Sequence, residues 1–217
     1  MLRGSRAGSW VIELLFVCIR MGTAGAEELP APVCELVLHD ELTQLADARI
    51  AVDLARSDFA AYERIFAMIQ GLRDAKTLPE MDYLKARYDR DAARLTLEQA
   101  DLLLGRQDAL VEQVRLLCGG AGNGKRDKAG AIRDAHLRYL RMDCEATAKA
   151  VDIADTRLEY HREYLRKIAK LRSESFATHT QVILAELDVE REEKNLADAR
   201  TRTGACRAAL AEAGIGR

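Results

Sequence analysis

The sequence contains little of what builds a sheet or breaks a helix. Its 217 residues include three prolines, and aromatic residues make up 5% of the chain. Aromatic and β-branched residues favour strands, whereas Ala, Leu, Arg and Glu, which are abundant here, favour helices. This composition therefore predicts an all-α protein.

The sequence also lacks an excess of charge of either sign. Lys and Arg number 33, Asp and Glu number 35, and the formal net charge is −2. The two signs are interspersed, which is typical of solvated helix faces. A field strong enough to attract nucleic acid is not expected, so we predict no nucleic-acid partner.

An apolar run long enough to span a membrane is missing as well. The run Trp10–Ile19 has about ten residues, against the roughly 20 that a spanning helix needs, and Glu13 interrupts it. Arg3 and Arg6 precede this run. A positive start followed by a short apolar segment is typical of a secretory signal peptide rather than of a membrane anchor.

A cleavage site for such a signal follows the apolar run. Ala24-Gly25-Ala26 has the small-x-small form that signal peptidases recognise. We therefore predict a signal peptide over 1–26, a mature chain that starts at Glu27 without a transmembrane segment, and export to the periplasm or cell envelope. The alternative is a poorly packed N-terminal helix, which the charge of Glu13 would suit.

Two stretches of the chain are related by a constant spacing. Residues 74–88 and 173–187 each interrupt a helical pattern with turn-forming residues and then restart it. Matching residues differ by 99 positions (185 − 86 = 99), as expected for an internal duplication of a helix–turn–helix unit. The matched pairs are Leu72 with Leu171, Ala86 with Ala185, Leu97 with Leu196, and Ala100 with Ala199.

Heptad spacing supports a long helix before each turn. Apolar residues recur every seven positions in the first unit, and a second set lies three positions further on, which forms the seam of a packed helix. Thr77-Leu78-Pro79 ends this helix because proline lacks an amide proton. The two sets are Leu38, Leu45, Val52, Phe59 and Phe66, and Ala48, Ala55, Tyr62 and Ile69.

The remaining pattern predicts three more helices and one connector. One helix begins at about Glu80 and continues to Cys118, and the glycine-rich segment 119–130 then ends the periodicity. We predict two long antiparallel helical hairpins, 27–118 and 131–217, joined by that linker. Together they form a coiled-coil-like, four-helix, up-down-up-down bundle. The rival fold is one hairpin of two very long helices, kinked near Pro79 and Ser175.

The cysteines favour the two-hairpin fold. Cys18 lies in the predicted signal peptide, and the other four allow three pairings. The midpoint of Cys34 and Cys118 is residue 76, and that of Cys144 and Cys206 is residue 175, which are the two predicted turns. We therefore predict disulfides Cys34–Cys118 and Cys144–Cys206, each closing the open end of one hairpin. The alternative is four free core cysteines.

The glycine-rich segment is similar to a phosphate-binding loop but does not complete the motif. Gly119 to Lys125 has the glycines and the lysine, yet Arg126 stands where a Ser or Thr must hold magnesium. A helical pattern, rather than a strand, precedes it. We therefore predict a plain linker and no nucleotide cofactor.

No arrangement of residues points to catalysis or to a metal. Di-iron bundles use Glu-x-x-His pairs, and the residue three positions before each histidine is Leu, Arg, Leu or Phe. No nucleophile–base pair is readable either. We predict no cofactor, no metal and no enzymatic activity. The histidines are His39, His136, His161 and His179.

The second turn and the helix after it carry a family resemblance. Thr178, Val182-Ile183, Ala185-Glu186, Leu196 and Ala199 match the pattern of the periplasmic tip and ascending helix of TolC-type outer-membrane efflux proteins, which this stretch resembles. The first turn is similar through Leu78-Pro79, Asp82, Leu84 and Ala86. It is also similar, through Tyr62 and Arg64, to the hairpin tips of adaptor (membrane-fusion) proteins.

The resemblance implies the helical part of that family without its barrel. Each repeat in the family carries a pair of strands that builds an outer-membrane pore. Here the corresponding place is the short segment 119–130, and no alternating apolar run of barrel length occurs. The resemblance thus implies a non-enzymatic coiled-coil protein that takes part in an envelope efflux or secretion assembly. The alternative is a periplasmic binding module or chaperone-like bundle that holds a ligand or client.

The turns are the predicted contact with a partner. The expected partners are other coiled-coil envelope proteins, or a second copy of the same chain. An exposed apolar surface near 77–84 and 175–183 would favour docking, and a lipophilic pocket would favour the binding module. Ordinary turn capping, with Phe176 folded back onto Ile168 or Leu171, is the structural alternative. The predicted contact residues are Leu78, Met81, Asp82, Phe176, Thr178 and Gln181.

Overall fold

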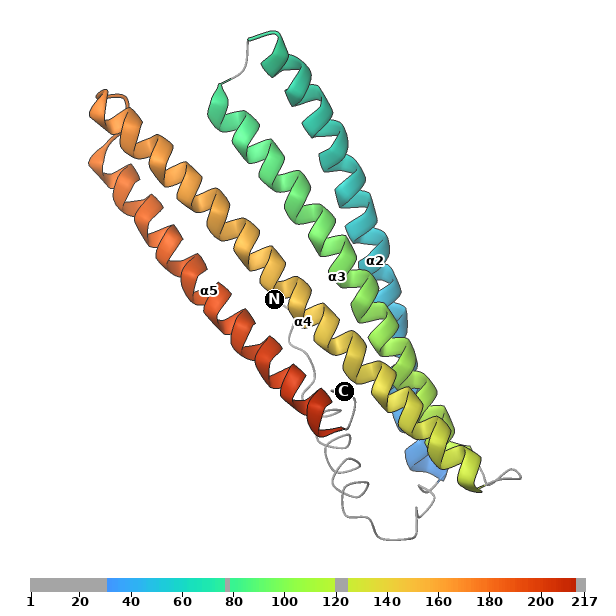
Figure 1. Ribbon diagram of the computed structural model, residues 1–217. Helices are drawn as coiled ribbons and strands as arrows, with labels where there is room; N and C mark the ends of the chain where they lie inside the picture. The colour runs from blue at the N-terminus through green and yellow to red at the C-terminus, as the bar shows by residue number, and fades with distance from the viewer. Residues whose placement is uncertain (1–30, 77–78, 120–124, 214–217) are drawn as a thin grey trace.

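The computed structural model describes residues 31–76, 79–119 and 125–213 (Figure 1). Four helices make up this part of the chain, and it contains no strand. The predicted signal peptide, Leu78 and residues 120–124 of the glycine-rich segment lie outside the described residues. The helices are α2 (Ala31–Asp74), α3 (Glu80–Cys118), α4 (Lys125–Ser173) and α5 (His179–Glu212).

The four helices run up-down-up-down, and each packs against the next one in the chain. The packed pairs are α2 with α3, α3 with α4, and α4 with α5, and no other pair of described helices packs to a similar extent. Figure 1 shows the result as a layer in which α2 and α5 are the outer helices and both turns lie at one end. The all-α prediction with two hairpins is confirmed. The rival single hairpin is wrong because the chain reverses at both turns.

The linker is shorter than predicted. α4 already begins at Lys125, so the segment from Lys125 to Gly130 is helical rather than part of the connector. Lys, Arg and Ala are strong helix formers, and one glycine near a helix end costs only about 1 kcal/mol, which the following turns of helix offset. The glycines clustered before Lys125 correctly predicted a break between two helices, whereas the isolated Gly130 lies within α4.

The seams of the two hairpins hold the cores that the heptads predict. In the first hairpin, Leu45, Val52 and Ala55 of α2 are buried. In the second, Leu158 of α4 and Leu196 of α5 form a buried cluster with Ala154. Val151, Val189 and Ala199 pack around that cluster.

Both disulfides close the open ends as predicted. The Cα atoms of Cys34 and Cys118 lie 5.5 Å apart, and those of Cys144 and Cys206 lie 5.4 Å apart. Cys34 and Cys118 sit at the far ends of α2 and α3 from their turn. Cys144 lies well inside α4, so the first part of α4 extends past the second disulfide and packs on α3.

The two hairpins are joined along α3 and α4 by aromatic, ionic and close backbone contacts. The rings of Tyr88 and Tyr160 stack with centroids 4.4 Å apart. Gly105 lies so close to Met142 that a Cβ at this position would clash with the thioether. Because glycine is poor in a helix interior, its presence here marks a close approach of the two hairpins. Ion pairs add to this interface: Arg87 with Glu163, Arg106 with Asp143, and Arg138 with Glu112.

Among the described helices, none combines the length and apolarity that crossing a bilayer requires.

Candidate functional site

The turn between α4 and α5 has a well-defined backbone. Ser175 adopts the left-handed conformation, with φ 64°. The Ser175 amide donates to the Arg172 carbonyl at 2.9 Å, and the Phe176 amide donates to the Leu171 carbonyl at 2.8 Å. These two bonds make a Schellman motif, in which a serine takes the place that glycine usually occupies. The turn is therefore held in one shape, and that shape fixes where Phe176 points.

Phe176 does not pack where a Schellman motif normally places its side chain. The residue in this position usually contacts the residue five before it, which here is Leu171. Instead, Phe176 is 80% exposed, the most exposed of the large apolar residues in the described chain. The alternative in which Phe176 folds back onto Ile168 or Leu171 is therefore wrong.

Three more apolar side chains are exposed on the first turns of α5. They are Ile183, Leu184 and Leu187, and each is more than one-third exposed. Their neighbours Val182 and Ala185 are buried against α4, so the exposed three lie on the other sides of the helix. We call Phe176, Ile183, Leu184 and Leu187 the α5 tip patch.

Thr178 and Gln181 hold the start of α5. The Gln181 amide donates to Oγ1 of Thr178 at 3.2 Å, and the Thr178 amide donates to Oε1 of Gln181 at 2.8 Å. This reciprocal pair is a capping box, which satisfies two amides at the helix start. Both side chains were predicted to contact a partner. In this chain their hydrogen-bonding groups serve the turn itself, so the capping alternative holds for these two residues.

The first turn covers its own aromatic side chains. The rings of Phe66 on α2 and Tyr83 on α3 lie 5.7 Å apart. The guanidinium of Arg73 sits 3.8 Å from the Tyr83 ring centroid, and that of Arg90 sits 4.1 Å from the Phe66 centroid. Cation–π contacts of this kind tie the charged side chains to the rings. The aromatic residues of this tip are therefore engaged within the hairpin.

Of the residues predicted at the first turn, none combines apolar character with full exposure in the described structure. Met81 is half-buried and Asp82 is exposed. Leu78 lies outside the described residues. α3 starts after Pro79 without a side-chain cap. The exposed apolar surface expected near 175–183 is present, whereas its counterpart near 77–84 is not found among the described positions.

Charged contacts fix the two turns side by side. Nζ of Lys167, near the end of α4, lies 2.5 Å from Oε1 of Glu80, at the start of α3. The hydrogen bond and charge of Lys167 lower the pKa of the Glu80 carboxyl. The same ammonium lies 3.8 Å from Glu163 on its own helix. The contact with Glu80 therefore links the two hairpins near their tips.

A groove of about 520 Å³ runs along α4 between α3 and α5. Alanines form its floor, at Ala146, Ala150 and Ala154. Charged and amide side chains also line the groove, and two of them, Arg106 on α3 and Asp143 on α4, form an ion pair at 2.7 Å. A lipophilic ligand would have to desolvate these charges, so the groove does not favour the binding-module alternative in its lipophilic form. The other charged and amide residues of the groove are Gln99, Arg157, Glu192, Asn195, Asp198 and Arg202.

Two buried carboxyls, those of Glu41 and Glu192, were not predicted from the sequence. Glu41 is 2% exposed between α2 and α3, and burial raises the pKa of its carboxyl. Nε2 of Gln107 donates to Oε2 of Glu41 at 2.6 Å. The signal was present, because position 41 lies seven before Ala48 and so falls in the heptad seam. Glu41 does not line the groove, and its contacts are those of a structural pair.

The described residues hold no cluster of three or more His, Cys, Asp or Glu side chains that could bind a metal. No protein-family model, curated protein or solved structure matches the chain. The resemblance to TolC-type proteins therefore stays a prediction from the residues of the two turns.

Proposed function

We propose that this chain is a non-enzymatic interaction protein of the cell envelope, which docks a partner coiled coil at the turn between α4 and α5. The observation that carries the proposal is the 80% exposure of Phe176 on a turn whose backbone is fixed by a Schellman motif and a capping box. A large aromatic side chain exposed on a turn with a defined backbone shape suits the anchor of a protein interface.

The surroundings of Phe176 suit a helical partner. Ile183, Leu184 and Leu187 extend the apolar surface along α5. Contiguous exposed apolar patches mark sites of protein–protein interaction. An amphipathic helix or a second helical tip presents apolar residues at matching intervals. The partner class we propose is therefore a coiled-coil hairpin.

Placement in the envelope rests on the sequence of the N-terminal segment and on the two disulfides. Disulfides form in oxidising compartments such as the periplasm, and both pairs close correctly here. Participation in an efflux or secretion assembly is the finer proposal. It is supported by the resemblance of the second turn to the tips of TolC-type proteins.

The proposal is tested by comparing Phe176→Asp with Leu36→Asp. Leu36 is a matched control because it is 70% exposed on α2, near the end of the molecule away from the turns. A tagged protein would be used to capture partners from cell-envelope extract, and melting temperatures would be measured in parallel. We expect Phe176→Asp to reduce capture by at least about tenfold, the loss typical of an aromatic anchor, with little change in melting temperature. Leu36→Asp should capture like the wild type.

Two results would contradict the proposal. If Phe176→Asp retained the captured proteins, the tip would not be the docking site. If it lowered the melting temperature strongly, Phe176 would be structural.

A further inference from the structure

The groove along α4 is lined by six charged side chains, and two of them are left without an ion pair. Four of the six neutralise one another in two pairs within the groove. For Arg157 of α4 and Glu192 of α5, no oppositely charged group in the described part of the chain lies within ion-pair distance. The groove therefore offers one positive and one negative charge to a ligand. The paired residues are Arg106 with Asp143, and Asp198 with Arg202.

Arg157 and Glu192 lie at the same level of the second hairpin. The disulfide places Cys144 of α4 opposite Cys206 of α5. Arg157 is 13 residues further along α4 (157 − 144 = 13), and Glu192 is 14 residues back along the antiparallel α5 (206 − 192 = 14). Each is then about 20 Å from the disulfide at 1.5 Å per residue. A single small molecule can therefore reach both groups.

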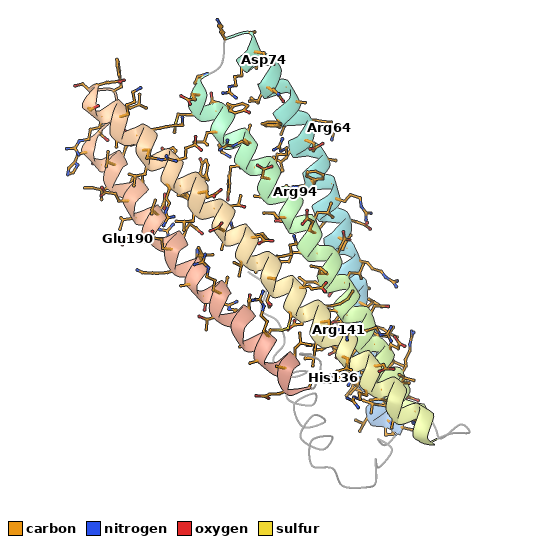
Figure 2. All side chains as sticks on the ribbon, viewed as in Figure 1. Arg64, Asp74, Arg94, His136, Arg141 and Glu190 are labelled. Atoms are coloured by element: carbon orange, nitrogen blue, oxygen red, sulfur yellow. A yellow bond between two sulfur atoms is a disulfide. The ribbon has the colours of Figure 1, made fainter. Side chains whose placement is uncertain are left out.

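The hydroxyl of Tyr88 on α3 lies near both charges. Burial raises the pKa of this hydroxyl, the positive charge of Arg157 opposes the rise, and the negative charge of Glu192 adds to it. Figure 2 shows α4 running between α3, which Arg94 marks, and α5, which Glu190 marks. Polar groups from three helices therefore meet at this level of the groove.

The surroundings of the two charges suit two different ligand groups. Glu192 is 9% exposed, and its Oε2 accepts a hydrogen bond from the Asn195 amide at 3.1 Å. A buried carboxylate without a positive partner is costly, and an ammonium group of a ligand would supply the missing charge. Arg157 is exposed, and a guanidinium can bind a carboxylate through two parallel hydrogen bonds.

We propose that this groove binds a small zwitterion, whose ammonium group contacts Glu192 and whose carboxylate contacts Arg157. Free amino acids and short peptides both carry these two groups. The groove has a volume of about 520 Å³, within the roughly 300–1,000 Å³ that is usual for ligand sites. Ala150 and Ala154 on its floor leave room between the flanking helices. The site lies along the helices, away from the turn, so it goes beyond the proposed docking.

Isothermal titration calorimetry of the purified protein tests the ligand class. The probes are alanine and alanyl-alanine, each also in an N-acetylated and a C-amidated form. We expect at least one of the two zwitterions to bind, and its two blocked forms to bind at least about tenfold more weakly, since each lacks one charged contact. Tighter binding of alanine assigns the site to free amino acids, and tighter binding of alanyl-alanine assigns it to short peptides.

Substitutions of the two unpaired groups test the site itself. Glu192→Gln keeps the shape of the side chain and removes its charge, and Arg157→Gln does the same at an exposed position where folding is not at risk. Each should weaken zwitterion binding at least about tenfold. Asp198→Asn is the matched control, because it removes an equal charge from the same helix and groove, but from a residue that is already paired with Arg202. Its zwitterion affinity should equal that of the wild type.

Three results would overturn the proposal. The first is a wild type that binds neither alanine nor alanyl-alanine. The second is a wild type that binds the blocked forms as tightly as the zwitterions. The third is equal weakening by Asp198→Asn and by Arg157→Gln, which would show that the unpaired groups have no special role. Melting temperatures measured in parallel identify any variant that loses binding because it unfolds, and Arg157→Gln then decides the test.

Discussion

The two hairpins have the same layout but use their tip aromatic residues in opposite ways. In the first, Phe66 and Tyr83 face each other, and Arg73 and Arg90 stack on them. In the second, Phe176 contributes its backbone amide to the hydrogen bonds of the turn, while the residue stands 80% exposed. An aromatic residue contributes to stability where it is packed and to recognition where it is presented. This difference supports the proposal that the second tip, rather than the first, docks a partner.

The two outer helices, α2 and α5, also differ in where they expose apolar residues. α2 exposes apolar residues along most of its length, whereas α5 exposes them near its start. The apolar surface of the first hairpin therefore lies on its outer side, and that of the second lies at its tip.

The largest expected effect comes from removing one disulfide at a time, and it should be the same in both hairpins. The two bridges close loops with sequence separations of 84 and 62 residues. The chain-entropy model gives about 4 kcal/mol for each, with a difference of about 0.3 kcal/mol between them. Urea unfolding of the Cys34→Ser/Cys118→Ser and Cys144→Ser/Cys206→Ser variants measures this. If one pair alone mattered, the two hairpins would not be equivalent units.

A second comparison exchanges an inward aromatic residue and an outward one for alanine. Phe66→Ala should lower the free energy of unfolding by about 2 kcal/mol, less than for a fully buried phenylalanine because Phe66 is half-buried. Phe176→Ala should change it by less than about 0.5 kcal/mol, as is usual at exposed positions. Urea denaturation of both variants is the measurement. Similar losses in both would remove the distinction between the tips.

The capping of the two turns gives a smaller difference. Thr178→Ala removes the capping box and should cost about 1 kcal/mol, because the Gln181 amide then loses its acceptor. Amide hydrogen exchange at the start of α5 should rise, while exchange at the start of α3 should stay unchanged, since α3 begins without a side-chain cap. Unchanged exchange at Gln181 would show that the cap is not needed.

The smallest expected effect is a dependence of stability on pH that belongs to the first hairpin. Burial raises the pKa of Glu41 above its ordinary value of 4.5, so the folded state holds this proton more tightly than the unfolded state. Its contribution to stability is then greatest at low pH and is lost as the pH rises from about 4.5 through the raised pKa. Unfolding free energies of the wild type and Glu41→Gln, measured against pH, should differ in slope over this window. Parallel curves would contradict the assignment.

The fold was largely predictable because its signals are periodic and repeated. Heptads placed Leu45 and Val52 in the core, and the 99-residue spacing placed both turns, with which the midpoints of two cysteine pairs coincide. The start of α4 was missed because a single glycine, Gly130, was weighted like the glycine cluster before it. Glu41 was missed because the seam was searched for apolar residues alone. Counting the heptad positions of polar residues as well predicts that the Glu41 carboxyl lies in the seam.

The candidate site was harder to predict than the fold, because exposure depends on the conformation of one turn. Phe176, Thr178 and Gln181 were all predicted to meet a partner. Their different environments, an exposed Phe176 and a capping box of Thr178 and Gln181, depend on turn geometry that periodicity does not report. The exposed apolar face of α2 was not predicted, because its sequence signal is weaker than that of the heptad seam with which it overlaps.

The most direct test of the docking role is photo-cross-linking from the two tips. A photoreactive phenylalanine analogue would replace Phe176 in one protein and Phe66 in another, and both would be irradiated in cell-envelope extract. The account predicts a covalent adduct with a different envelope protein from position 176 and no intermolecular adduct from position 66, whose ring is engaged by Tyr83 and Arg90. No adduct from position 176, or the same adducts from both positions, would contradict it.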